Sequence, residues 1–221
     1  MHMKGLTDNI TDYLRAQIIT GAIPPGKRLN EVELASRLEV SRSPLREAFR
    51  HLAREHLVIN TPRRGTYVSP ISLEDLEKTF QVREIFELYT IELLKRKKIR
   101  NLPDVEASLT RSVELKNASS DDLPTVLVHQ GIVTDFHFKL IESVNNPFVT
   151  EFYRIIASHL ARYQYLKFLK PGEKNHAVKD HQKILKYISA GEHDQAKEYL
   201  RKHIQYTFEL LKKSVSESIH P

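Results

Sequence analysis

The sequence predicts a mainly α-helical protein, in which a small N-terminal domain of helices and one β-hairpin precedes an all-helical antiparallel bundle. Three observations support this fold class. The chain of 221 residues has only 7 glycines, which is few for an all-β protein because tight turns consume glycine. Hydrophobic residues make up 40% of the chain, which is enough for a packed core. Apolar residues recur mostly at helical spacing.

Three helices are expected in the first 70 residues. Apolar side chains recur at helical spacing over 6–20, and a Pro-Pro-Gly turn follows. Asn30 can cap a second helix over 31–38. Ser41 or Ser43 can cap a third helix, which is expected to end at about Glu55. The buried stripe of this third helix is expected at Leu45, Ala48, Phe49 and Leu52.

A β-hairpin is expected after the third helix. The segments 57–60 and 66–69 are β-prone, and the five residues between them end in Gly65, which suits a hairpin loop. The pattern is helical from there to the end, so we expect domains at 1–70 and 71–221. Helices of the second domain are expected over 73–98, 103–117, 123–144, 147–169, 174–190 and 193–216.

The order of these first elements is that of a winged helix-turn-helix, whose second paired helix enters the major groove of DNA. The basic excess lies mainly here, since residues 1–70 carry 11 basic and 7 acidic side chains. With the stripe of the third helix buried, the residues left outward are Ser41, Arg42, Ser43, Arg46 and Arg50. Arg64 and Gly65 lie at the expected hairpin tip. Such side chains can reach bases or phosphates. The alternative is an ordinary solvated helix in which Arg50 and Arg54 pair with neighbouring Glu residues.

The segment 29–68 resembles the DNA-binding domain of GntR-family transcription regulators. The residues that carry the resemblance are Glu33-Leu34-Ala35, Val40 to Ala48, Leu52 and Arg64-Gly65-Thr66-Tyr67-Val68, after a loop containing Pro24-Pro25-Gly26. The resemblance implies DNA contacts from Arg42, Ser43 and Arg46, with Ser41 close by, and from Arg64 and Gly65 in the wing. Some members of the family also use an Arg early in the second helix, where this chain has Val32.

Three histidines of the second domain could share a metal ion. His137, His181 and His203 lie in three different expected helices, each beside apolar neighbours, and bundle-core metal sites are assembled in this way. Neutral imidazole is a common ligand of transition metals, and three of them leave positions open for water or a small anion. The absence of Cys excludes thiolate ligands, a Cys nucleophile and a disulfide framework.

Residues 72–216 resemble the all-helical FCD effector domain of the FadR subfamily of GntR regulators. The matching residues are Arg83 with Glu87, Phe136-His137, Asn146-Pro147, His181 to Leu185, Gly191, Ala196 and His203. The resemblance implies a divalent transition metal such as Zn or Ni on the three histidines. Family members that bind metal place an Asp one turn before the first His, where this chain has Val133. The site is therefore three His plus water, or has a different local geometry, or has lost its metal.

Arg83 is the expected effector-binding residue. Within the family a cavity Arg commonly meets the carboxylate of the effector, a planar bidentate task for which Arg is suited. The alternative is an intrahelical ion pair with Glu87 at i+4. Asp180, His159 and Arg162 are further residues that could support the cavity.

The function expected from these features is a cytoplasmic, homodimeric transcription regulator that binds a double-stranded operator, most simply as a repressor, under control of a small carboxylate. One alternative keeps the DNA-binding domain but binds a metal-independent organic effector such as an acyl-CoA. A less favoured alternative is a three-His metalloenzyme, although no HExxH, GxSxG, P-loop or GxGxxG motif is present. No secretory signal is visible, and no apolar run approaches the roughly 20 residues of a membrane span.

Overall fold

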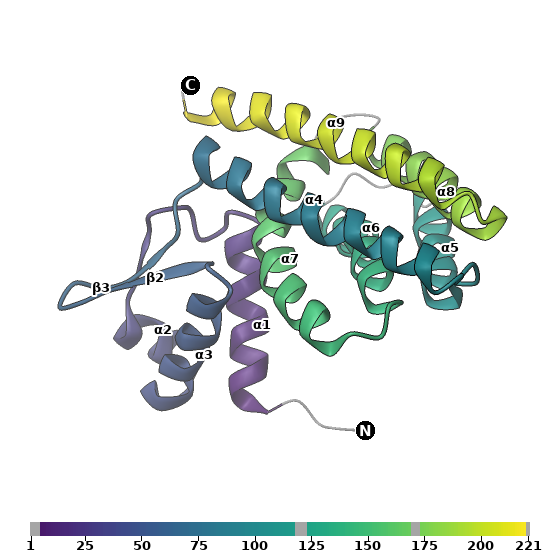
Figure 1. The fold of residues 1–221 in the computed structure, drawn as a ribbon. Coiled ribbons are helices and arrows are strands. Elements are labelled where there is room, and N and C mark those ends of the chain that lie inside the picture. The colour runs from purple at the N-terminus through teal and green to yellow at the C-terminus, as the bar shows by residue number, and fades with distance from the viewer. Residues whose placement is uncertain (1–4, 118–122, 169–172, 220–221) are drawn as a thin grey trace. The chain divides into compact units, whose positions relative to one another are not determined.

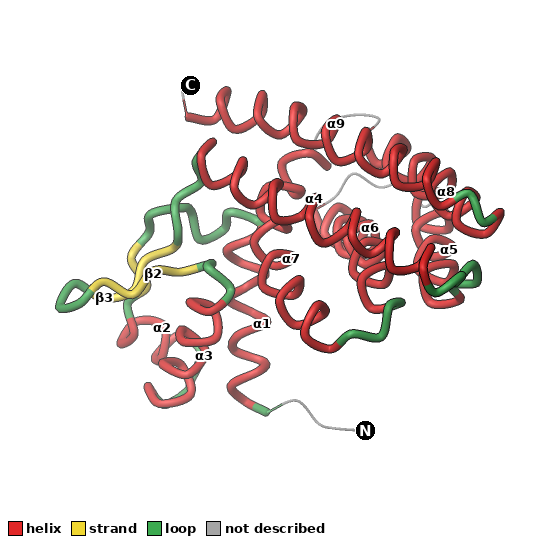
Figure 2. Tube along the Cα trace, viewed as in Figure 1, coloured by secondary structure: helices red, strands yellow, loops and turns green. Residues whose placement is uncertain are grey.

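The structure is a computed structural model that describes residues 5–117, 123–168 and 173–219. The chain divides into two compact units, Met1–Ile71 and Ser72–Pro221, each with its own core. Figure 1 labels the helices and the strands β2 and β3, and Figure 2 separates helices, strands and loops by colour. The mainly α-helical fold class expected from the sequence is confirmed, with a small winged unit followed by a helical one.

The first unit contains three helices and a small sheet. Its elements are α1 (Leu6–Ile19), β1 (Arg28–Leu29), α2 (Glu31–Arg37), α3 (Arg42–Arg54), β2 (Val58–Thr61) and β3 (Gly65–Val68). Asn30 caps α2 as expected, since its side chain accepts hydrogen bonds from the backbone of Val32 and Glu33. The buried stripe of α3 is the expected one, and it packs against apolar side chains of α1 such as Leu14.

The sheet has a third strand that the sequence pattern did not predict. The strand order is β1-β3-β2, and β1 pairs antiparallel with β3 so that Arg28 lies opposite Tyr67. Two residues are too few to show the alternation by which a strand is detected in a sequence. The hairpin loop is also shorter than expected, because β2 extends to Thr61, which pairs with Gly65.

The second unit consists of six long helices in the part of the chain that the structure describes. They are α4 (Leu73–Arg96), α5 (Pro103–Asn117), α6 (Leu123–Glu142), α7 (Pro147–Phe168), α8 (Glu173–Ala190) and α9 (His193–Ile219). Helix α4 packs against α6, α7 and α9, and α8 packs against α9. Helices α4 and α9 are antiparallel, since Lys95 near the end of α4 pairs with Asp194 at the start of α9, and the earlier Glu84 pairs with the later Arg201. Among the helices of the described ranges, none is both long enough and apolar enough to span a bilayer.

Candidate functional site

Helix α3 and the hairpin present the seven predicted DNA-contacting residues to solvent. Ser41 occupies the N-cap position of α3, but its side chain makes no capping hydrogen bond. The exposed residues are Ser41, Arg42, Ser43, Arg46 and Arg50 on α3, with Arg64 and Gly65 on the hairpin. Burial of the opposite stripe of α3 fixes this orientation. Val32, where some similar proteins carry an Arg, is 60% exposed on α2.

Two arginines of this surface pair with glutamates. Arg46 Nε donates to Glu31 Oε2 at 2.8 Å, and Arg50 Nη1 donates to Glu47 Oε2 at 2.5 Å. The side chains of Arg46 and Arg50 are 57% and 64% exposed. Exposed pairs of this kind contribute only about 0–1 kcal/mol, so a phosphate or a guanine edge can replace the carboxylate at little cost.

The hairpin tip gathers more positive charge than the sequence suggested. Arg63 and Gly65 both have positive φ, at +62° and +108°, and together they turn the chain between β2 and β3. A Cβ atom at Gly65 would lie 3.2 Å from Arg28 Nε, so the glycine leaves room for the guanidinium of β1. Arg28 therefore joins Arg63 and Arg64 at the tip. The sequence reasoning missed Arg28, because its place depends on the unpredicted strand.

The second unit brings the three predicted histidines together. His137 of α6, His181 of α8 and His203 of α9 are buried, and one ligand nitrogen of each lies within 4.8 Å of the others. His137 Nε2 and His181 Nε2 are 3.0 Å apart. The ring of His181 stacks on Phe136 at a centroid distance of 4.0 Å. The donor set of three imidazoles fits a borderline divalent ion such as Zn or Ni, and it would leave coordination positions open.

Two carboxylates orient the rings of this cluster. Glu87 Oε2 lies 2.9 Å from His137 Nδ1, and Asp180 Oδ2 lies 2.8 Å from His203 Nδ1. When each Nδ1–H donates to its carboxylate, the Nε2 atom keeps the lone pair that a metal requires. Burial would raise the pKa of Glu87, but the positive charges of Arg83 and His137 bring this pKa below its usual value. Burial likewise opposes ionisation of Asp180, while the hydrogen bond from His203 lowers its pKa.

Arg83 lies at the edge of the histidine cluster. It is 1% exposed, its Nε donates to Glu87 Oε1 at 2.7 Å, and its Nη2 lies 2.9 Å from His137 Nε2. The ion pair with Glu87 that the sequence offered as an alternative is therefore present. It does not use the whole guanidinium, because the buried Nη1 has no hydrogen-bond partner among the described residues.

Other residues near the cluster differ in their roles. Tyr153, which sequence reasoning missed, donates to Glu87 Oε1 at 2.5 Å from α7. His159 bonds instead to Asp75, with 2.5 Å between Nε2 and Oδ2. Asp135 accepts a hydrogen bond from Arg111 Nη2 at 2.9 Å and is not hydrogen-bonded to the rings of the cluster among the described contacts. Arg162 of α7 is buried. The side chain of Val133 lies outside the described residues.

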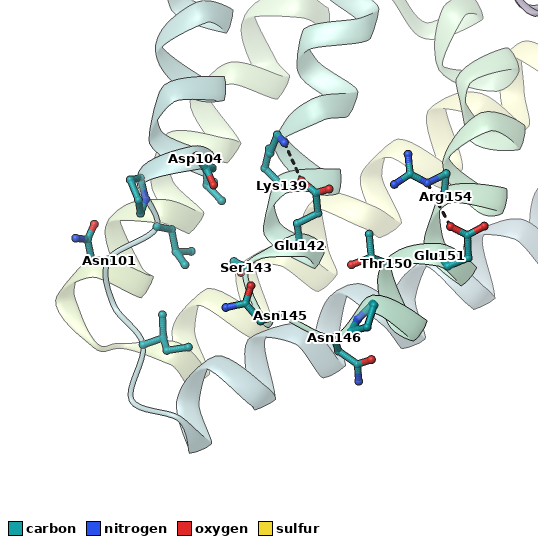
Figure 3. Close-up of a pocket in the computed structure, with 15 residues that line it drawn as sticks. Asn101, Asp104, Lys139, Glu142, Ser143, Asn145, Asn146, Thr150, Glu151 and Arg154 are labelled. Atoms are coloured by element: carbon teal, nitrogen blue, oxygen red, sulfur yellow. Dashed lines mark hydrogen bonds and ion pairs between the residues drawn. The ribbon is translucent and has the colours of Figure 1, made fainter. Parts of the chain in front are cut away.

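The second unit also has a hollow away from these residues, where α4 and α6 end and α5 and α7 begin. Its volume is about 780 Å³, and Figure 3 shows its polar side chains. Its two cations are already paired: Lys139 with Glu142 at 2.7 Å, and Arg154 with Glu151 at 3.6 Å. The three histidines and Arg83 do not line it. Neither cation of the hollow therefore resembles Arg83, whose buried Nη1 has no hydrogen-bond partner among the described residues.

Comparison with protein families matches both units. Residues 6–68 match the sequence model of "Bacterial regulatory proteins, gntR family", and residues 78–206 match that of the FCD domain. The HTH-type transcriptional regulator YdhC of Bacillus subtilis is 23% identical over 207 residues, covering 93% of this chain and 91% of its own. The Nta operon transcriptional regulator of Aminobacter aminovorans is 25% identical over 197 residues, covering 87% and 90%. The gluconate operon transcriptional repressor of Bacillus licheniformis is 31% identical over 137 residues, covering 60% and 56%.

Solved structures share the fold. A GntR transcriptional regulator from Rhodococcus sp. RHA1 superposes with a TM-score of 0.76 at 22% identity, covering 93% of this chain and 96% of that one. The metal-free FCD domain of TM0439 superposes with a TM-score of 0.53 at 14% identity, covering 67% and 99%. At these identities the likeness establishes the arrangement of elements only.

Proposed function

The chain belongs to the gntR family of bacterial regulatory proteins and carries an FCD domain, and from this premise we propose that it is a homodimeric repressor released or recruited by a small carboxylate at a histidine-bound metal. The coarser function follows from the family itself: the chain is a DNA-binding transcription regulator and not an enzyme. The GntR and FCD combination is consistent with the FadR subfamily.

The seven exposed residues of α3 and the hairpin are the proposed DNA contacts. Arg46 and Arg50 can exchange exposed carboxylate partners for base edges or phosphates. Arg64 and Gly65 are proposed to enter or border the minor groove, with Arg28 as an added cation. Because each chain has one such reading helix, two chains on a two-fold operator are proposed as the working form. A cytoplasmic location follows from this role.

The observation that carries the sensor proposal is the buried cluster itself. His137, His181 and His203 would hold a divalent ion such as Zn or Ni, which when bound supplies a Lewis-acidic point for an anion. Arg83 would orient one carboxylate of the effector through its unpartnered Nη1. One relative is named as the transcriptional repressor of a gluconate operon, which supports the proposed repressor role.

One experiment tests the sensor. Operator DNA is selected from a random pool, and its affinity is measured with chelator-treated protein, with added Zn²⁺ or Ni²⁺, and with metal plus a panel of carboxylates. The proposal expects metal-dependent binding of a carboxylate that changes operator affinity, and expects His181→Ala to remove both effects. Gln182→Ala, at the exposed position next to His181 on the same helix, is the matched control. No bound metal, together with unchanged effector binding in His181→Ala, would refute the metal. A retained organic ligand seen by mass spectrometry would favour the metal-independent alternative.

A further inference from the structure

Arg46 and Arg50 of α3 use different nitrogens to bind their carboxylate partners. Arg46 binds Glu31 Oε2 through Nε at 2.8 Å, and no hydrogen bond among the described residues engages its Nη1 or Nη2. Arg50 binds Glu47 Oε2 through the terminal nitrogen Nη1 at 2.5 Å. A guanidinium carries five N–H donors in a fixed plane, and its two terminal nitrogens form a fork at the far end. This fork is therefore open in Arg46 and partly occupied in Arg50.

The open fork of Arg46 matches the edge of a guanine. Guanine presents two acceptors, O6 and N7, in the major groove, and a bidentate Arg is its commonest partner. Arg46 can meet both acceptors with Nη1 and Nη2 while Nε stays on Glu31. Arg50 would have to release Glu47 before it could offer the same fork. Of these two arginines, Arg46 alone can read a guanine without losing its protein partner.

Glu31 is held in place by the residues on both sides of it. Asn30 caps α2 by accepting hydrogen bonds from two backbone amides of its first turn. Leu29 of β1 is 5% exposed, and Leu34 of α2 is 6% exposed. Helices α2 and α3 pack against each other and lie side by side in Figure 1. The carboxylate of Glu31 therefore extends from a backbone whose position relative to α3 is fixed.

A carboxylate on Nε orders a side chain that is otherwise free to change rotamer. The Arg46 side chain is 57% exposed, and an arginine loses much conformational entropy when it is immobilised. When this ordering takes place on binding, it lowers the affinity for the ligand. With Glu31 on Nε, part of the ordering precedes contact with DNA. The bond joins two charged groups, so it is stronger than a neutral hydrogen bond and fixes the direction of the fork.

We propose that Glu31 is a positioning residue that aims the fork of Arg46 at one guanine of each operator half-site, which rests on the DNA contacts in the proposed function. Glu31 acts through Arg46, because a carboxylate by itself is repelled by the phosphates of DNA. Its removal weakens the choice of base at one position. The general attraction of the chain to DNA stays unchanged or becomes stronger, since one negative charge is lost beside a polyanion.

Base-pair substitutions in the selected operator test the proposal with the full chain. Each base pair of the half-site is replaced in turn, and fluorescence anisotropy gives the ratio of Kd for the replaced site to Kd for the original site. The base pair whose ratio falls in Arg46→Ala is the one that Arg46 reads. At that base pair we expect Glu31→Ala to lower the ratio about 2- to 12-fold per half-site, the effect of ordering one long side chain on binding. Affinity for unrelated DNA should not fall, whereas damage to α3 would lower both quantities.

Two further variants of α2 sharpen this test. Glu33→Ala is the matched control, because Glu33 is an exposed acid in the same first turn, and it should leave every ratio unchanged. Glu31→Gln keeps an oxygen that can accept from Arg46 Nε without the charge, so it should retain more of the ratio than Glu31→Ala. Circular dichroism checks folding. Glu31→Ser, which is also too short to reach Arg46, replaces Glu31→Ala if the latter does not fold.

The outcomes separate this proposal from the function it rests on. A folded Glu31→Ala chain with the wild-type ratio at that base pair overturns the positioning role while leaving α3 as the reading helix. In a chain that already carries Arg46→Ala, adding Glu31→Ala should alter no ratio; a further loss would show that Glu31 contacts DNA itself and would also overturn the role. A wild-type chain that selects no sequence, or an Arg46→Ala chain that keeps every ratio, overturns the proposed reading by α3 together with this role.

Discussion

Replacement of Arg46 by Ala is the sharpest test of how α3 reads DNA. The side chain is 57% exposed, and its Nε donates a hydrogen bond to Glu31 Oε2 at 2.8 Å. Loss of such a pair changes the free energy of unfolding by about 0–1 kcal/mol. Loss of a bidentate contact to guanine costs about 1–3 kcal/mol in binding, or roughly 5- to 150-fold in Kd, and two copies on a two-fold operator count it twice. Arg46→Ala is therefore expected to lose specific operator binding while remaining folded.

Fluorescence anisotropy with the selected operator, repeated at several salt concentrations, measures this loss. Arg37→Ala is the control, because Arg37 is an exposed arginine in the last turn of α2. If Arg46 touches a phosphate rather than a base, the slope of log K against log salt should become shallower by about 1 per lost contact. An Arg46→Ala protein that binds the operator as tightly as the wild type, at every salt concentration, would show that α3 is not the reading helix.

Three further changes test the cluster and the core. Asp180→Asn, which weakens the support of His203 Nδ1, should lower metal affinity about 10- to 100-fold in a competition titration with a chromophoric chelator, and an unchanged affinity would remove Asp180 from the site. Arg83→Lys keeps a charge but loses the planar fork, so calorimetry should show effector affinity falling about 10-fold or more while metal still binds; equal affinity would assign Arg83 to the Glu87 pair alone. Leu52→Ala, at a fully buried position of α3, should reduce the free energy of unfolding by about 2–5 kcal/mol in a denaturant titration, and a loss below about 1 kcal/mol would contradict the packing described.

The helices could be predicted from the sequence because their signals are local. Asn30 before α2 and the apolar stripe of α3 act within a few residues of the backbone they fix. Strand β1 could not be predicted, because Arg28 and Leu29 become a strand only by pairing with β3 almost 40 residues later. The place of Arg28 beside Gly65 depends on the same pairing.

The histidine cluster could be predicted only in part, because the histidines have local signals but their hydrogen-bond partners do not. Each histidine stood out locally by lying among apolar residues of a helix, and family resemblance grouped the three. The partners of the rings come from distant segments: Glu87 meets His137 from 50 positions away, and Tyr153 meets Glu87 from 66. Asp180 lies next to His181 in sequence, yet it serves His203 on another helix. Spacing within one helix does not contain that information.

The charges around the three histidines determine how a divalent ion and an anionic effector would bind together at this site. The three imidazoles are neutral as ligands, Arg83 adds one positive charge, and the position of the family's ligating Asp is Val133 in this chain. Glu87 and Asp180 are engaged with the rings, not placed as ligands. A divalent ion would thus arrive without a negative ligand of its own, and an anionic effector would supply it. Binding of the two would then be cooperative, each raising the affinity for the other by the same factor, so that the regulator reads metal and carboxylate jointly.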